Sequence, residues 1–223
     1  MTLQRRYGIL LVLLITSYLL SAFITRRWIG DLQLVLFSLA GLIEIRNAPL
    51  SRRTARLIVA AGFIVSLLMI VVADHVGGDT GRGAAALWKG VLLLLIAATI
   101  LRQVFLARHV TAQNIYGAIS VYLIIGLMFS AFYAAMYYLN GRVFFFGHQP
   151  GDASNFQYFS FTTLTTLGYG DFTAASNGGR AVAMIEAMTG QIFLATLVAK
   201  LVSSFRPPAP RRSAGGGGGT APG

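Results

Sequence analysis

Cysteine is absent from the 223 residues, and charged residues are scarce at 11% of the chain. Without cysteine the chain cannot form disulfide bonds, thiolate metal sites or a cysteine nucleophile. A soluble globular domain usually carries about 25% charged residues, so the shortage of charge argues against an ordinary soluble fold. Hydrophobic residues instead make up 56% of the chain, and the mean hydropathy is +0.69. This composition is typical of an integral membrane protein.

Acidic residues are also few, 7 against 18 lysines and arginines, which leaves a net charge of +11. Such a charge would suit a nucleic-acid-binding protein, but the basic residues lie in short clusters between apolar runs. Membrane proteins distribute charge in this way. We therefore expect a lipid bilayer, and no nucleic acid, as a partner. The sequence shows no internal repeat, phosphate-binding loop or catalytic constellation, so we expect no enzyme.

Six apolar runs approach the length of a membrane span, which is about 20 residues for a hydrocarbon core of roughly 30 Å. The second run is the weakest, because Asp31 lies near its start. The first is either a span or a cleaved signal peptide, and its length and poor cleavage site favour a span. We predict an all-α membrane protein with six transmembrane helices: Tyr7–Thr25, Trp28–Ile45, Ala55–Ala73, Ala84–Leu101, Ile115–Leu139 and Arg180–Val202.

The basic residues also predict the orientation of these helices. With the N-terminus inside, twelve basic residues fall in inside segments and six in outside segments. Because positive charge favours the cytoplasmic side, both termini are expected in the cytoplasm. One basic cluster either follows this rule alone or also binds anionic lipids; it contains Arg46, Arg52, Arg53 and Arg56.

A stretch of different character, residues 140–179, separates the last two runs. It begins with a Gly/Pro-rich turret, Asn140–Ser154, and then Asn155–Thr165 reads as an amphipathic helix capped by Asp152 or Ser154. This helix is too short to span a membrane, so we expect it to be re-entrant. The non-helical segment Thr166–Gly170 follows. Such backbone persists at membrane depth only where protein buries it or where it lines an aqueous path.

The segment Thr166–Gly170 has the residue types that binding of a dehydrated cation requires. Such a cation needs stacked oxygens in place of its water shell, and backbone carbonyls supply them when they point to one side. That conformation needs φ > 0 at intervals, which glycine tolerates at Gly168 and Gly170. The predicted oxygens come from Thr166, Leu167, Gly168, Tyr169 and Gly170, with the Thr166 hydroxyl as the innermost ring.

Neighbouring residues are expected to support this filter. Tyr169 should point away from the pore and pack against Tyr158 and Phe159, which would brace the diameter of the ring. Asp171 should attract cations at the outer mouth, and the short helix, ending at Thr165, should direct its partial negative charge towards the pore. The competing interpretation is an extracellular hairpin rich in Gly, Tyr and Asp that conducts no ions.

The run Thr166-Leu167-Gly168-Tyr169-Gly170-Asp171 resembles the Thr-x-Gly-Tyr-Gly signature of the potassium-channel pore family. The resemblance covers about residues 115–204, and the chain looks like bacterial six-helix ion-channel proteins. It implies permeant potassium ions, no cofactor and a homotetramer, since a pore needs four loops and the chain has one. Two positions depart from the family: Leu167, where valine or isoleucine is usual, and Thr162, where some bacterial channels have a glutamate.

Three residues of the sixth run are candidates for pore support or gating. Glu186 either hydrogen-bonds the back of the pore helix, at Thr162 or Thr163, or reaches water at the outer face. Gln191 faces either the cavity beneath the filter or a neighbouring helix. Gly190, which the resemblance aligns with the family's hinge glycine, is either a hinge or a close-packing residue.

The predicted domains are a four-helix transmembrane domain (1–110), a pore domain (111–205) and a disordered tail (206–223). The first domain lacks a voltage sensor's arginine ladder, because no charge lies between Lys89 and Arg102 in the fourth run. Residues 102–113 are expected to form a linker helix at the membrane interface.

Together these features predict a potassium-selective channel that is not strongly voltage-gated, in the plasma membrane of a bacterium. The alternatives are a less selective cation channel, a potassium-transporter-like subunit and a non-conducting scaffold. Transporters of that kind carry four degenerate pore loops in one chain, whereas this chain has one, which disfavours the transporter-like subunit. A scaffold has no need of Gly168 and Gly170, which disfavours the third.

Overall fold

A computed structural model describes residues 6–23, 61–62, 64–69, 71, 78–106 and 111–204. The described residues are helical apart from turns, loops and one isolated antiparallel bridge between Phe145 and Ala174. The elements are α1 (Arg6–Phe23), α4 (Gly78–Leu106), α5 (Ala112–Leu139), the 3₁₀ turn η3 (Phe146–His148), α6 (Ala153–Leu164) and α7 (Asn177–Ser204). The described part of 61–71 is also helical.

Three of the helices are long and apolar enough to cross a membrane: Gly78–Leu106, Ala112–Leu139 and Asn177–Ser203. They contain the predicted fourth, fifth and sixth spans, and α1 contains a shorter apolar helix, Tyr7–Ser21, within the predicted first. The predicted second span, the basic cluster of residues 46–56 and the tail lie outside the described residues. The described parts of 102–113 belong to the end of α4 and the start of α5, preceded by the N-cap Thr111.

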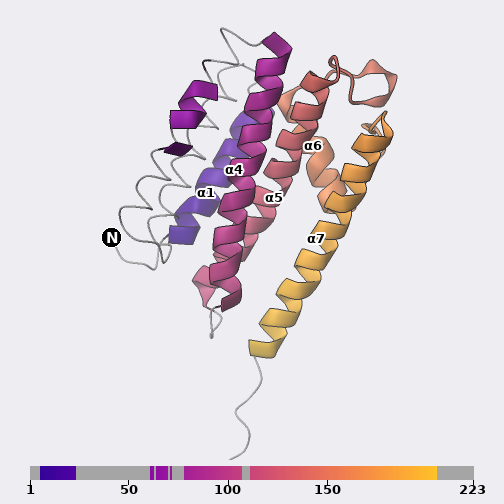
Figure 1. The fold of residues 1–223 in the computed structure, drawn as a ribbon. Helices are drawn as coiled ribbons and strands as arrows, with labels where there is room; N and C mark the ends of the chain where they lie inside the picture. Colours follow the sequence, from indigo (N-terminus) through magenta and orange to yellow (C-terminus); the bar gives the residue numbers. More distant parts are fainter. Residues whose placement is uncertain are drawn as a thin grey trace, which may run out of the picture.

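Helix α5 is the centre of the described structure. It packs against α1 and α4 on one side and against α6 and α7 on the other, an arrangement that Figure 1 shows. Fourteen of its residues are buried, as is typical of a helix that is hydrophobic all round. Gly126 permits the contact with α6, because a Cβ there would lie 2.6 Å from the Phe161 ring.

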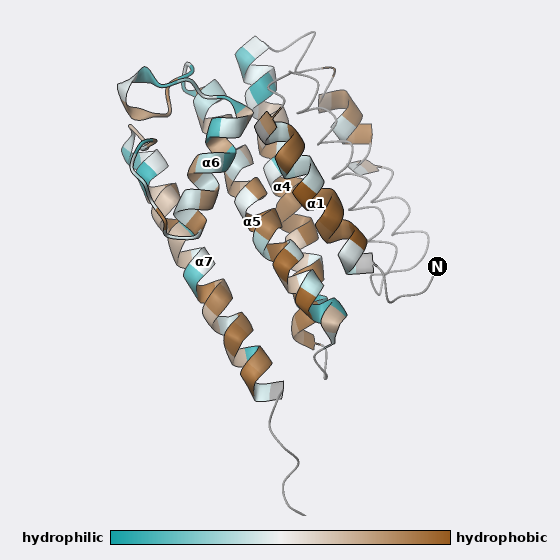
Figure 2. Cartoon of the chain, turned by 180° about the vertical axis from the view of Figure 1, so that it is seen from behind, coloured by the Kyte–Doolittle hydropathy of each residue, from teal (hydrophilic) through white to brown (hydrophobic). Residues whose placement is uncertain are grey.

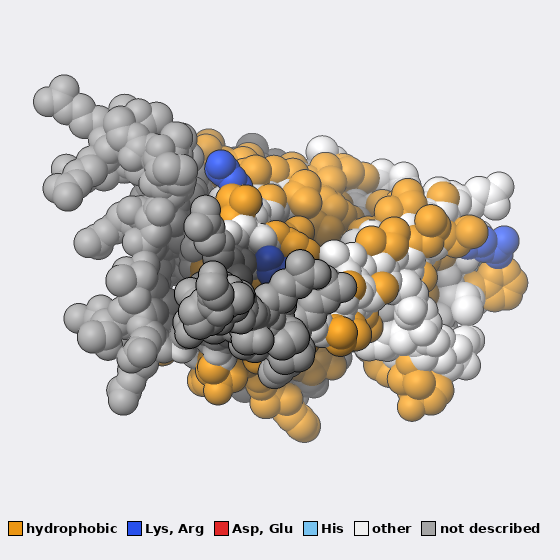
Figure 3. Space-filling model, turned by 90° about the horizontal axis from the view of Figure 1, so that it is seen from below, with side chains coloured by type: hydrophobic (Ala, Val, Ile, Leu, Met, Phe, Trp, Pro, Cys, Tyr) orange, Lys and Arg blue, Asp and Glu red, His pale blue; other side chains and the backbone are white. Residues whose placement is uncertain are grey.

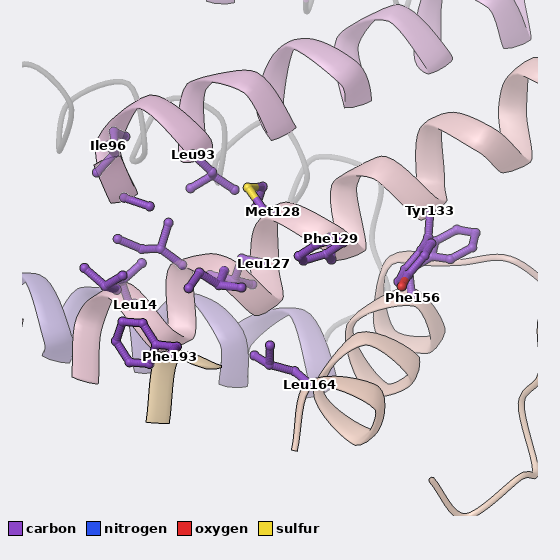
Figure 4. Close-up of a cluster of buried hydrophobic side chains, with 14 of the residues drawn as sticks. Leu14, Leu93, Ile96, Leu127, Met128, Phe129, Tyr133, Phe156, Leu164 and Phe193 are labelled. Atoms are coloured by element: carbon purple, nitrogen blue, oxygen red, sulfur yellow. The ribbon is translucent and has the colours of Figure 1, made fainter. Parts of the chain in front are cut away.

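Two kinds of packing share this core. Aliphatic side chains join the helices α1, α4 and α5, for example Leu14, Leu93 and Leu127, and Figure 4 shows them converging. Aromatic rings join α5, α6 and the turret. Each aromatic pair contributes about 0.5–1.5 kcal/mol of stability beyond the contribution of its buried area. The rings with centroids 4.9–5.8 Å apart include Tyr133, Phe144, Phe145, Phe156, Phe159 and Phe172.

Two polar contacts join α4 to the pore side of the molecule, one at each end. At its start, Asp79 accepts two hydrogen bonds from the Arg142 guanidinium, at 2.8 and 2.6 Å, and this contact raises the pKa of Arg142. At its other end, Lys200 Nζ of α7 donates to the Phe105 carbonyl at 2.9 Å. A cation is favourable there, because the last carbonyls of a helix carry partial negative charge.

The outer surface of the helices is apolar. Figure 2 shows hydrophobic residues along α1, α4 and the part of α7 farthest from α6, with hydrophilic residues at the loops around α6. The described surface seen in Figure 3 is likewise mostly hydrophobic, with few lysines or arginines. Exposed apolar side chains on α7 include Met184, Ile185, Met188, Ile192, Val198 and Val202. This surface requires lipid or other protein to cover it.

Candidate ion-conduction site

The short helix α6 begins at a side-chain cap. The Asp152 carboxylate accepts a hydrogen bond from the Asn155 backbone N–H at 2.8 Å, which satisfies one of the unpaired donors of the first turn. The sequence predicted this cap, and the structure confirms Asp152 over Ser154. With 12 residues, α6 is about 18 Å long at 1.5 Å per residue, too short to cross a membrane.

At its other end, α6 passes directly into the predicted filter. Thr165, the C-cap, donates to the Phe161 carbonyl through its backbone N–H at 3.1 Å and its hydroxyl at 2.7 Å. The next backbone donors fold back on the helix end, Thr166 to the Thr163 carbonyl at 2.9 Å and Gly168 to the Thr162 carbonyl at 3.1 Å. The segment itself therefore satisfies carbonyls that a helix end leaves unpaired.

The backbone of the segment alternates in handedness. Thr166, Gly168 and Gly170 have φ of +58°, +50° and +81°, whereas Leu167 and Tyr169 are not among the residues with positive φ. Alternation of this kind gathers successive N–H groups on one side and so leaves the carbonyl oxygens on the other. The glycines have the positive φ predicted for them. The positive φ of Thr166 was not predicted and is unusual for a β-branched residue, and strained residues of this kind cluster at functional sites.

The segment faces open space within one chain. All residues from Thr165 to Asp171 are exposed, and a Cβ placed on Gly168 or Gly170 would meet no atom within 4 Å. Polar backbone without a covering layer is tolerated at membrane depth only beside water or other protein. Within a membrane, the segment would therefore have to face water or other protein.

Helix α7 contacts the segment from beneath. Gln191 Nε2 donates to Thr166 Oγ1 at 3.4 Å, so Gln191 lies below the filter, one of the two predicted positions. Gly190 packs on the last residue of α6: a Cβ there would meet the Leu164 carbonyl oxygen and lie 3.0 Å from Leu164 Cδ1. The same carbonyl accepts a hydrogen bond from the Tyr122 hydroxyl at 3.3 Å. Gly190 is thus a close-packing residue in this structure.

The outer end of the segment differs in part from the prediction. Tyr158 packs edge-on against Phe172, the second residue after the filter segment, with ring centroids 5.9 Å apart, so it does lie beside the filter. Phe159 does not brace Tyr169, because it is only 7% exposed and packs into the core, whereas Tyr169 is 69% exposed. Phe159 points away from Tyr169 because it lies on the face of α6 that contacts Tyr133 of α5.

Glu186 has different partners from those predicted. It is fully buried and contacts the Ser160 and Tyr133 hydroxyls, whereas the Thr162 hydroxyl donates to the Phe159 carbonyl of its own helix. Neither Ser160 nor Tyr133 was singled out from the sequence. Ser160 could have been found, because it shares a face of α6 with buried residues four positions away on each side.

Comparison with known families identifies this part of the chain. Residues 119–206 match the family model described as an ion channel. They begin within α5 and extend past the end of α7, so that they include α6 and the filter segment. This match supports the resemblance to the potassium-channel pore family that the filter motif indicated. No curated protein and no solved structure matches the chain.

Proposed function

We propose that the chain forms a potassium-selective channel, which conducts K⁺ passively through a homotetrameric pore and is not strongly voltage-gated. The observation that carries this proposal is the exposed segment Thr166–Gly170, with its alternating φ, at the end of a short helix between two membrane spans. No covalent chemistry is required, because conduction replaces one set of oxygen ligands by another.

Selection of potassium then follows from the ligands of the ion. Carbonyl oxygens of residues 166–170 from each subunit, together with the Thr166 hydroxyl, take the place of the hydration shell. The partial negative charge at the end of α6 and the Asp171 carboxylate favour cations over anions along the same path. Gln191 holds the Thr166 hydroxyl from below through its hydrogen bond at 3.4 Å.

The homotetramer is supported by the incomplete burial of α7. Only 17% of the most hydrophobic 18-residue stretch of α7 is buried within the chain, compared with 67% of the corresponding stretch of α5. One filter segment cannot surround an ion, whereas four copies about a fourfold axis can. In this arrangement the exposed face of α7 turns towards the pore cavity and neighbouring subunits.

The expected setting is a bacterial plasma membrane with both chain ends in the cytoplasm. This orientation rests on the excess of basic residues in the inside segments, and it places the filter towards the outer face. Weak voltage dependence is supported by α4, which has no charged residue between Lys89 and Arg102. A voltage sensor needs several charges within the membrane field.

Reconstitution into proteoliposomes tests the proposal. Potassium flux that barium blocks, with potassium preferred over sodium by at least about tenfold or about 1.4 kcal/mol, is the expected result. Equal reversal potentials in the two ions would favour the alternative of a less selective cation channel. Flux that depends on a coupled ion gradient would favour a transporter-like subunit, and a mass other than four chains would contradict the tetramer.

A further inference from the structure

Glu186 joins three helices through one chain of short polar contacts. Its side chain has an exposure of 0%. The Tyr133 hydroxyl of α5 donates to Glu186 Oε2 at 2.5 Å. Ser160 Oγ of α6 lies 2.5 Å from Glu186 Oε1 and 2.6 Å from the Gly126 carbonyl oxygen of α5. The contacts thus run without interruption from Tyr133 through Glu186 and Ser160 to Gly126.

Counting hydrogens shows what these contacts require. Three oxygen–oxygen contacts at hydrogen-bond distance need three hydrogens. The hydroxyls of Tyr133 and Ser160 supply one each, and the Gly126 carbonyl supplies none. When Ser160 donates to Gly126, its contact with Glu186 is filled only if the carboxyl group carries a hydrogen on Oε1. An ionised Glu186 would leave two oxygens in contact without a hydrogen between them.

The surroundings of the carboxyl group agree with this count. Burial of a carboxylate costs several kcal/mol unless a cation is paired with it. The ion pairs found among the described residues both involve Asp79, with Arg82 and with Arg142, and neither includes Glu186. A neutral acid avoids this cost and completes the chain of hydrogen bonds.

We propose that Glu186 is held as a neutral carboxylic acid and acts as a positioning residue that clamps α6 between α5 and α7. Ser160 lies about one helical turn before Leu164, the last residue of α6. The filter segment follows directly, so a displacement of Ser160 would displace the filter. The protonation state stands on the geometry alone, whereas the effect on conduction rests on the proposed channel function.

Infrared difference spectroscopy of the full chain in lipid bilayers at neutral pH tests the protonation state. The wild-type spectrum minus that of E186Q should contain the C=O stretching band of a protonated carboxylic acid. Glu44 is the other glutamate of the chain, and E44Q provides the matched control. The acid band should remain in the spectrum of E44Q, so that it cancels when that spectrum is subtracted from the wild-type spectrum. A difference spectrum that contains carboxylate bands without the acid band would overturn the proposal.

Substitutions at the same position test the clamp. E186Q should retain assembly and potassium flux close to the wild type, because an amide donates to Ser160 and accepts from Tyr133 as the neutral acid does. E186A removes both contacts and E186D is too short to keep both. Each should reduce flux by about tenfold or more, equivalent to about 1.4 kcal/mol.

The outcomes separate this proposal from the proposed function. If E186Q fails to assemble, or if E186D retains flux where E186Q loses it, a negative charge is required and the proposal is wrong. If the acid band is present but no sample conducts potassium, the neutral acid stands and the proposed channel function fails.

Discussion

Helices α4 and α7 have nearly equal lengths, 29 and 28 residues, but the chain covers them to different extents. In the most hydrophobic 18-residue stretch of each helix, the buried share is 33% for α4 and 17% for α7. Helix α4 packs extensively on α5, whereas α7 contacts α6 and α5 and leaves Met188 and Val202 more than 60% exposed. Helix α4 therefore obtains more of its packing within its own chain, whereas α7 relies more on lipid or on other protein to cover it.

The largest expected difference is between substitutions at two glycines that have nearly the same φ. Gly168 in the filter and Gly78 at the start of α4 have φ of +50° and +49°, and a Cβ would meet no atom within 4 Å at either. Alanine at each site adds similar strain, roughly 1–2 kcal/mol. G168A should abolish conduction or its selectivity, whereas G78A should lower stability only. Reversal potentials in potassium and sodium provide the measurement, and wild-type currents from G168A would contradict the filter assignment.

The next largest difference is expected between alanine substitutions at two glycines that pack against another helix. G190A places a methyl group against the Leu164 backbone carbonyl, which cannot move without shifting the filter, whereas G90A meets the ring of Phe132. Overpacking typically costs about 1–3 kcal/mol, and we expect the upper part of that range for G190A and the lower part for G90A.

Thermal unfolding of the reconstituted protein, together with potassium flux, distinguishes the two variants. G8A is the control, because a Cβ at Gly8 meets no atom within 4 Å. If G190A matched G8A in both measurements, close packing at Gly190 would not be required.

A smaller effect is expected where the two sides of the molecule meet. K200M removes the hydrogen bond between α7 and the Phe105 carbonyl but keeps the aliphatic stem. A partly exposed contact of this kind contributes about 1 kcal/mol. We expect a lower unfolding temperature and an altered open probability in single-channel recordings, with unchanged selectivity. A changed reversal potential would show that this contact also shapes the filter.

The smallest expected effect is that of voltage. One charge that crosses the full membrane field contributes about 2.3 kcal/mol per 100 mV, but α4 carries no charge between Lys89 and Arg102. Both of these side chains can extend to the membrane surfaces. A conductance–voltage curve in symmetric potassium should therefore be shallow, and K89Q should leave its slope unchanged. A slope equivalent to about four or more gating charges per channel would show that the first four runs sense voltage.

The local features of the pore region could be predicted from the sequence, because short-range rules determine them. Asp152 caps α6, Gly168 and Gly170 adopt positive φ, and α6 is too short to span a membrane. Contacts between helices could not be predicted, because they depend on the rotation of each helix about its axis. A small error in that rotation moves the partner of Glu186 from Thr162 or Thr163 to Ser160.

The same limit applies to Phe159, which the sequence predicted to pack against Tyr169 behind the filter and which the fold directs into the core. The positive φ of Thr166 also had no signal in the sequence, since a β-branched residue ordinarily avoids that region. It depends on how the segment folds back on α6.

The hydrogen bond between Lys200 and Phe105 brings together two points that lie 95 residues apart in the chain. Between them lie α5, α6, the filter and most of α7, so the pore region leaves α4 and returns to it at nearly the same place. A domain whose two ends are adjacent can be inserted into a larger chain, or removed from it, with little disturbance to the rest. The pore region therefore has the geometry of a transferable module, and the family match, which begins within α5, has nearly the same extent.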